Sequence, residues 1–220
     1  MFNIAIDGPA GAGKSSIARA AAANLGFIYV DTGALYRTVA LAALKQGLQP
    51  EEKEKIVALL PDIDVSMGFV DGEQRVFLNG EDVSEDIRLP EVSAAASTVS
   101  AIPEVRQFLF DLQRDMAKTN DVLMDGRDIG TVVLPDAQLK IFLTATPEER
   151  ARRRYEQIKD KSEVTYEEVL KDLNQRDYQD THREIAPLKQ ADDAVLLDTT
   201  NMSFEEVVKA IEDLAKERQA

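Results

Sequence analysis

The sequence contains no cysteine and a single histidine among its 220 residues. Without cysteine there is no disulfide framework, no thiolate metal site and no cysteine nucleophile. With His182 alone, a histidine-based zinc site or a Ser-His-Asp triad has little to work with, and we expect His182 to be a surface residue. The sequence also lacks any apolar run near the roughly 18 residues that a membrane span needs.

Positive charge is scarce as well. The chain carries 26 lysines and arginines against 40 acidic residues, for a net charge of −14. A generally acidic surface argues against a nucleic-acid partner, although small phosphorylated ligands need only a local arginine cluster. Residues 1–9 lack the positive segment of a signal peptide. We therefore expect a cytoplasmic protein with no membrane or nucleic-acid partner, of a length that suits one compact domain with small appendages.

Short apolar runs alternate with helix-like stretches along the chain. The apolar runs predict five strands, at residues 2–7, 27–30, 121–125, 139–145 and 194–199. The stretches between and after them predict helices at 14–25, 33–46, 51–60, 91–118 with a break at Pro103, 147–158 and 165–177, and a last helix capped by Ser203 and Glu206. Strands that alternate with helices predict an α/β fold with a parallel sheet covered on both faces. Ligands in such folds bind beyond the carboxyl ends of the strands.

Residues 63–84 show a different periodicity. Apolar and polar residues alternate there, and Asp71-Gly72 and Asn79-Gly80 interrupt the alternation. Asp-Gly and Asn-Gly between short alternating runs are typical of tight hairpin turns. The segment is predicted to form a small antiparallel meander, inserted into the α/β fold.

The first predicted strand runs into a glycine-rich loop. Residues 8–15, GPAGAGKS, match G-x-x-x-x-G-K-[ST] in full, and a predicted helix follows. Glycines let the backbone N–H groups point at phosphate oxygens, and the helix adds its positive N-terminal end. Lys14 supplies a charge for the β- and γ-phosphates, and the Ser15 hydroxyl can bind Mg²⁺. The chain lacks the D-x-x-G and N-K-x-D strings of GTPase switches. A small chain with this loop near its start is most often a small-molecule kinase that uses ATP.

Further polar motifs follow the predicted strands. They are Asp31-Thr-Gly-Ala-Leu-Tyr-Arg at 31–37, P-x-V-R at 103–106, Asp-Gly-Arg-Asp-Ile-Gly-Thr at 125–131, R-D-x-x-D-x-x-R at 176–183 and Ala-Pro-Leu at 186–188. In this order and spacing, and over essentially the whole chain, they resemble the bacterial cytidylate kinases, which phosphorylate CMP and dCMP. The resemblance implies a P-loop kinase fold with strand order 2-3-1-4-5. It implies one kinase domain, 1–220, with a core (1–31, 119–147 and 190–220), a monophosphate-binding region (32–118, with the β insert at about 62–86) and a mobile lid at about 148–168.

The resemblance also implies roles for individual residues. ATP would be bound by Gly8, Pro9, Ala10, Gly11, Ala12, Gly13, Lys14, Ser15 and Ser16. CMP would be bound by Thr32, Tyr36, Arg37, Ser97, Arg106, Arg127, Asp128, Arg176, Asp180 and Arg183. Catalysis would depend on Lys14, Arg127, Arg153 and Arg176, and Mg²⁺ on Ser15, with Asp125 acting through water.

Elementary chemistry agrees with these roles. Bidentate guanidinium groups at Arg37, Arg127 and Arg176 suit the acceptor phosphate. A carboxylate at Asp128 can accept a hydrogen bond from the cytosine N4 amino group, whereas uracil offers a carbonyl there. Other readings stay open: Ser97, Thr32 and Tyr36 could serve packing or capping, and Asp125 could be a buried structural carboxylate.

Four arginines, Arg150, Arg152, Arg153 and Arg154, lie within five positions of the helix predicted at 147–158. Helical geometry puts 150, 153 and 154 on one face and 152 away from it. In so acidic a chain this cluster suggests anion binding at the lid edge. Two rival functions stay open: a kinase for UMP, AMP or a small alcohol such as shikimate, and a nucleotide-binding regulator without transfer activity. A monomer is expected from the resemblance.

Overall fold

A computed structural model describes residues 1–70, 73–160 and 163–219. The chain forms two compact units, Met1–Tyr29 with Asn120–Ala220 and Val30–Thr119. We name them the core unit and the middle unit and describe each by itself. Across the described ranges, no helix is long and apolar enough to cross a membrane.

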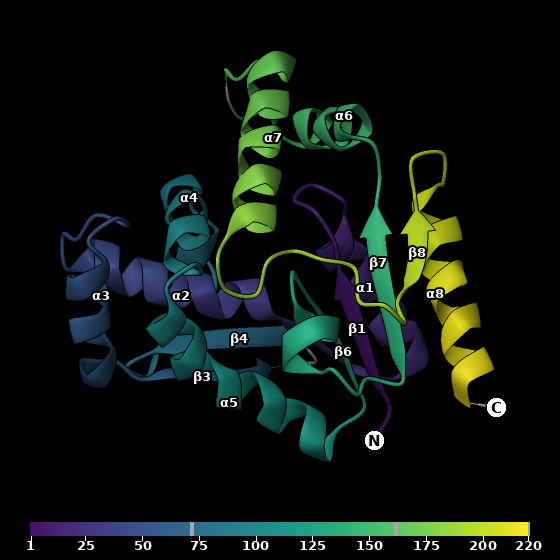
Figure 1. The fold of residues 1–220 in the computed structure, drawn as a ribbon, viewed down its shortest axis with the longest axis horizontal. Helices are drawn as coiled ribbons and strands as arrows, with labels where there is room; N and C mark the ends of the chain where they lie inside the picture. The colour runs from purple at the N-terminus through teal and green to yellow at the C-terminus, as the bar shows by residue number, and fades with distance from the viewer. Residues whose placement is uncertain (71–72, 161–162, 220) are drawn as a thin grey trace. The chain divides into compact units, whose positions relative to one another are not determined.

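The principal sheet has five strands in the order β2-β6-β1-β7-β8. The strands are β1 (Asn3–Asp7), β2 (Ile28–Asp31), β6 (Val122–Gly126), β7 (Leu139–Thr144) and β8 (Val195–Asp198). β1 pairs in parallel with β6 and β7, and β7 pairs in parallel with β8. Along the sheet this is the order 2-3-1-4-5, so the predicted α/β fold is confirmed (Figure 1). Ile4 and Ile6 of the central strand are fully buried, as the apolar run predicts.

Two helices of the core unit, α1 (Lys14–Leu25) and α8 (Phe204–Gln219), pack against each other. Their small and branched side chains, such as Ile17, Ala21 and Ile211, share one buried cluster with Ile4 and Ile141 of the sheet. The predicted cap of α8 is present, because Ser203 N donates to Glu206 and Glu206 N donates to the Ser203 hydroxyl.

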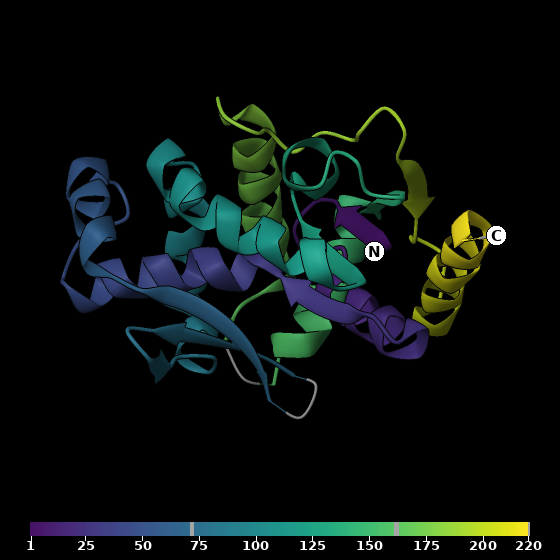
Figure 2. The ribbon, with the colours of Figure 1, turned by 90° about the horizontal axis from the view of Figure 1, so that it is seen from below.

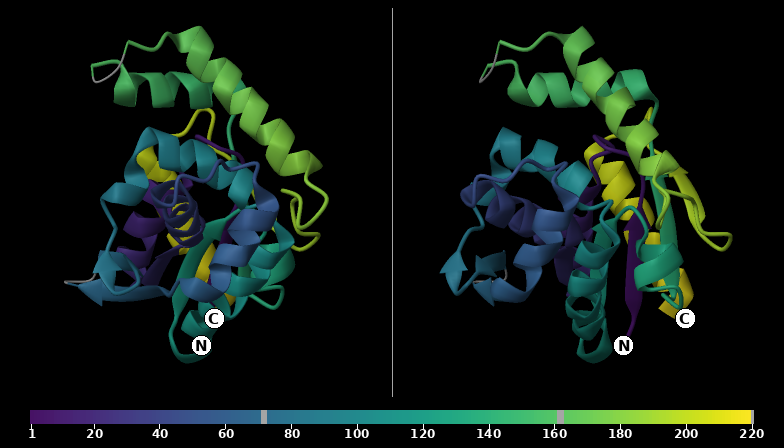
Figure 3. Two further views of the ribbon diagram at one scale, coloured as in Figure 1. Left: turned by 90° about the vertical axis from the view of Figure 1, so that its left-hand side faces the viewer. Right: turned by 60° about the vertical axis from the view of Figure 1, so that its left-hand side comes forward.

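A helical pair follows β7 in the core unit. α6 (Pro147–Ile158) and α7 (Tyr166–His182) pack on each other through an apolar cluster that includes Ala151, Val169 and Leu173 (Figure 3). A capping box of Thr165 and Glu168 fixes the start of α7. The predicted end at residue 177 is wrong, because the helix continues to His182. No glycine or proline interrupts that stretch, and the Thr181 hydroxyl donates to the Asp177 carbonyl at 2.6 Å.

The middle unit holds the predicted meander. β3 (Val65–Val70), β4 (Glu73–Leu78) and β5 (Glu81–Asp82) form an antiparallel sheet. Asn79 and Gly80, both at positive φ, make the tight turn between β4 and β5, as predicted. The other predicted turn, Asp71-Gly72, lies outside the described residues.

The helices of the middle unit are α2 (Thr32–Lys45), α3 (Lys53–Leu59), α4 (Pro90–Val99) and α5 (Pro103–Thr119), with short 3-10 turns at Leu60–Asp62 and Asp86–Arg88. The predicted break at Pro103 is confirmed. α2 lies along the small sheet and contacts β3, β4, α4 and α5 (Figure 2). Leu35 and Val39 of α2 are fully buried in the apolar core that these elements share.

Candidate functional site

The glycine-rich loop joins β1 to α1, as its sequence predicts. At Gly8 the backbone adopts φ +152°, and a Cβ there would lie 2.0 Å from the Leu143 carbonyl oxygen of β7. Gly13 precedes α1 at φ 82°, in the left-handed region. Only glycine fits the approach at residue 8 without displacing β7. The loop is therefore held against the carboxyl end of the sheet.

Lys14, the first residue of α1, is buried within this loop. Its Nζ donates to the carbonyl oxygens of Gly8 and Pro9, each at 2.7 Å. Burial lowers the pKa of Lys14 to about 7, and nearby Arg127 adds to that effect, whereas Asp125 and other carboxylates oppose it. A poorly solvated ammonium group gains much from an anionic ligand, so the site favours a phosphate chain.

Next to Lys14, the Ser15 hydroxyl donates to Asp125 Oδ2 at 2.9 Å. Asp125 lies one residue before the end of β6 and accepts a second hydrogen bond from the Tyr29 hydroxyl at 2.9 Å. A hydroxyl and a carboxylate are oxygen ligands of the kind that Mg²⁺ prefers, so these residues fit the metal. In the described part of the chain no group of three His, Cys, Asp or Glu could hold a metal. Magnesium held mainly by substrate phosphates needs no such group.

Asp7, the last residue of β1, organises the loop after β6. Its carboxylate accepts from the backbone N–H groups of Ile129 and Gly130, each at 2.7 Å. These two residues begin a π-helical turn, Ile129–Val133, that the sequence did not predict. Arg127 and Asp128, immediately before the turn, are thereby fixed in place. Burial raises the pKa of Asp7 to about 6, although the two N–H donors oppose the shift.

The pKa of Asp7 predicts a pH-dependent stability. Because the folded-state pKa lies above the usual 3.8, the folded protein binds this proton more tightly than the unfolded chain. The resulting stabilisation is present below pH 3.8 and is lost as the pH rises through 6. Asp7→Asn removes the titration. The free energy of unfolding of the wild type minus that of the variant should therefore fall by up to about 3 kcal/mol between pH 4 and 7. Urea unfolding of both proteins measures this, and parallel pH profiles would contradict it.

Two ion pairs join the loop after β6 to the end of α7. Arg127 Nε donates to Asp180 at 2.7 Å, and Arg183 Nη2 to Asp128 at 3.3 Å. Burial alone would lower the pKa of Arg127, but Asp180 raises it, so the guanidinium stays charged. Four of the residues predicted to bind the acceptor are thus brought together, although they lie about 50 positions apart in the sequence.

Arg176 lies one turn before Asp180 on α7. It is half-buried and forms an ion pair with Asp172, its Nε donating at 3.1 Å. Residues four apart lie on one side of a helix, so Arg176 and Asp180 occupy the same face of α7, and Arg183 follows the helix directly as its C-cap residue. Arg176 is therefore on the side of α7 that holds Arg127.

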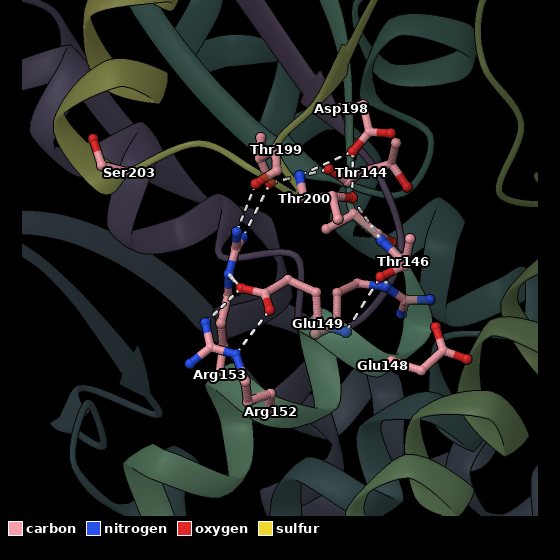
Figure 4. A network of polar contacts seen from close by, with 12 residues as sticks. Thr144, Thr146, Glu148, Glu149, Arg152, Arg153, Asp198, Thr199, Thr200 and Ser203 are labelled. Carbon is pink, nitrogen blue, oxygen red and sulfur yellow. Dashed lines mark hydrogen bonds and ion pairs between the residues drawn. The ribbon is translucent and has the colours of Figure 1, made fainter.

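Arg153 joins α6 to the segment after β8 (Figure 4). Its guanidinium donates to the Thr199 hydroxyl at 3.1 Å and the Thr199 carbonyl at 2.6 Å, and its Nε donates to Glu149 at 2.7 Å. The hydrogen bond from Arg152, followed by that from Arg153, lowers the pKa of Glu149 to about 2. The predicted arginine face holds for Arg150 and Arg153, which are not exposed. Arg154 has the same helical spacing to Arg150 but is exposed to solvent.

In the middle unit, the predicted residues lie on three helices. Arg37 pairs with Asp31 at 2.7 Å, and Asp31 also caps α2 by accepting from Ala34 N. The Arg106 guanidinium of α5 lies 5.6 Å from the centre of the Tyr36 ring of α2 and donates to a carbonyl at the end of α4.

The remaining two predicted residues of this unit have uncharged side chains. Thr32 is buried at the start of α2, and Ser97 is half-buried on α4. Both positions suit packing as well as ligand contact, so the alternative left open by the sequence stays open for them.

Several residues of the site were not predicted from the sequence. They are Asp7, Tyr29, Glu149, Asp177 and Thr199. Asp7 and Asp177 did carry a signal, since Asp7 precedes the phosphate loop and Asp177 is part of the motif at 176–183, but no pattern indicates which backbone groups they hold.

Comparison with known proteins agrees with these features. The family model for cytidylate kinase matches residues 4–217. A cytidylate kinase of Caldicellulosiruptor bescii is 54% identical over 214 residues, covering 97% of this chain and 95% of that protein. One of Caldanaerobacter subterraneus subsp. tengcongensis is 55% identical over 209 residues, covering 94% and 92%. A crystal structure of an uncharacterized protein from Eubacterium ventriosum superposes with a TM-score of 0.52 at 10% identity, covering 98% of this chain and 99% of that one, which concerns the fold alone. From motifs, fold and relatives together, the chain belongs to the cytidylate kinase family.

Proposed function

We infer that the protein transfers the γ-phosphoryl group of ATP to CMP and dCMP, forming CDP and dCDP. The observation that carries this proposal is the loop after β6. There, Asp180 of α7 holds Arg127, and Arg183, directly after α7, holds Asp128. Asp7, which precedes the phosphate loop, holds the backbone of the next two residues. The relatives named cytidylate kinase support the choice of acceptor.

Asp128 is the residue that we assign to the cytosine base. It is buried, and the Arg183 guanidinium lies 3.3 Å from its carboxylate. An ionised carboxylate accepts hydrogen bonds but cannot donate them, so it matches the N4 amino group of cytosine and opposes the O4 carbonyl of uracil. Arg106 and Ser97 supply donors for the other polar atoms of the base.

The acceptor in this reaction is a phosphate oxygen that is already anionic, so no general base is needed. The chain's part is then to position two anions and to reduce the repulsion between them. Lys14 serves the donor phosphates, whereas Arg37, Arg127 and Arg176 serve the acceptor phosphate. Arg153 on α6 completes the set of predicted catalytic residues.

Magnesium is the cofactor that we propose, with Ser15 as ligand and Asp125 acting through water. Held by these residues, Mg²⁺ would supply positive charge that offsets the negative charge developing on the ATP phosphates. The hydrogen bond between Ser15 and Asp125 already orients both oxygens toward one place. Asp125 also serves structure through Tyr29, so both roles foreseen for it are compatible.

The cellular assignments are proposals as well. The net charge of −14 supports the absence of a nucleic-acid partner. A cytoplasmic monomer that acts in pyrimidine nucleotide metabolism is proposed from the resemblance to the family. The lid at about 148–168 and the monophosphate-binding region at 32–118 rest on the resemblance to the family.

A panel of acceptors tests the proposed function. With Mg-ATP, we expect ADP formation with CMP and dCMP, and a kcat/KM at least about a hundredfold lower with UMP, since an unmatched polar group in a buried site costs roughly 3 kcal/mol. AMP and shikimate should give less still. UMP turnover equal to that of CMP would refute the role of Asp128. A regulator without transfer activity would form no ADP in response to any monophosphate.

A further inference from the structure

Two side chains that the reaction above does not use hold a single peptide unit of the phosphate loop. Arg150 of α6 donates from Nη1 to the Ala10 carbonyl at 2.7 Å. Asp177 of α7 accepts from the Ala10 N–H at 3.1 Å. The two side chains also pair with each other, Nη2 to Oδ2, at 2.7 Å. Together they close a ring of hydrogen bonds around both polar groups of Ala10.

Apolar side chains also pack this part of the loop, around Ala10, against α6 and α7. Ala10 is buried in one cluster with Ala151 of α6 and with Val169 and Leu173 of α7. A Cβ at the neighbouring Gly11 would lie 3.2 Å from both terminal methyl groups of Leu173. The loop tip therefore rests on α6 and α7, and the ring of hydrogen bonds fixes its orientation there.

Each nitrogen of the Arg150 guanidinium contacts a protein atom. Its side chain is 4% exposed, and its Nε donates to the Ala145 carbonyl at 3.0 Å in addition to the contacts with Ala10 and Asp177. An arginine that binds a phosphate directly presents its guanidinium to the ligand, whereas that of Arg150 is buried against protein atoms. Its charge instead balances Asp177, a carboxylate that would otherwise repel a triphosphate in the adjoining loop.

We propose that Arg150 and Asp177 are positioning residues for ATP. By fixing the Ala10 peptide they hold the following residues, Gly11 to Ser15, in the curl that turns successive N–H groups toward the phosphates. Neither side chain touches the reacting atoms. The inference rests on the proposed function, because it takes ATP to be the ligand of the loop.

Three variants test this role: Asp177→Ala, Arg150→Met, and Arg150→Met combined with Asp177→Asn. Each single variant should raise KM for ATP by about tenfold or more and leave KM for CMP within about twofold. In the double variant the asparagine oxygen can still accept from Ala10 N–H, and the unpaired carboxylate is gone. Its KM for ATP should therefore be at least about threefold lower than that of Arg150→Met. If the two substitutions merely damaged the structure, their effects would add, and KM for ATP would be higher in the double variant than in Arg150→Met.

Lys171→Met is the matched control, since Lys171 lies on α7, as Asp177 does, and is exposed to solvent. It should leave both KM values unchanged. An unchanged KM for ATP in the single variants, or equal rises in KM for ATP and CMP without rescue, would overturn the proposal. If Arg150→Met fails to fold, Asp177→Ala decides by the same split between the two KM values. Failure of the proposed function is distinct, because the wild type would then form no ADP with CMP.

Discussion

Arg176→Ala is expected to lower kcat with CMP by about a hundredfold to a thousandfold, the usual cost of removing one donor to a developing charge. Arg176 lies one turn before Asp180, which holds Arg127 at 2.7 Å, so its guanidinium is on the proposed acceptor side of α7. Its pair with Asp172 is partly exposed, with side-chain exposures of 35% and 60%. Such surface pairs add little stability, so the midpoint of thermal unfolding should shift by less than about 2 °C.

Steady-state kinetics and thermal unfolding of the same preparation test this expectation. Asp172→Asn is the matched control, because it removes the ion pair while keeping Arg176. Its kcat should stay within about twofold of the wild type. Near-normal turnover in Arg176→Ala would remove this arginine from the mechanism, and equal losses in the two variants would show that the ion pair itself is what matters.

Gly8→Ala is expected to damage both the fold and the reaction. The new methyl group would lie 2.0 Å from the Leu143 carbonyl oxygen, so either the loop or β7 must shift. Backbone strain and clash of this kind cost several kcal/mol, which for a chain of this size lowers the unfolding midpoint by at least about 6 °C. Because the loop itself moves, turnover should fall by about a hundredfold or more.

Gly26→Ala separates the clash from simple conformational strain. Gly26 ends α1 at φ +73°, and a Cβ there would have no neighbour within 4 Å. In this variant only the left-handed conformation is unfavourable, which lowers the free energy of unfolding by roughly 1–2 kcal/mol. Its kinetics should match those of the wild type. Differential scanning calorimetry and kinetics of both variants provide the comparison. Equal midpoints for the two would mean that β7 accommodates the methyl group at residue 8.

Much of the fold could be predicted because its signals are local. The order of strands and helices follows from apolar runs and periodicity, and the turn at Asn79-Gly80 follows from two residues that tolerate positive φ. The errors arose where local signals are weak. α7 runs five residues past its predicted end because nothing in 178–182 stops a helix, and the π-helical turn at Ile129–Val133 depends on Asp7, far away in the sequence.

The sequence alone determined that this chain has a phosphate loop, because the motif is contiguous and each of its four specified positions has a local physical reason. It also indicated the family, through motifs in a fixed order. Only the tertiary structure decided which charged groups act on which backbone atoms. Asp7 accepts hydrogen bonds from Ile129 and Gly130, and Arg150 and Asp177 bind the backbone of Ala10. These partners lie 122 to 167 positions apart in the sequence. Any of the chain's 40 carboxylates could pair with any of its 26 cations as far as sequence goes. The order of the strands and the packing of α6 on α7 bring these particular groups together.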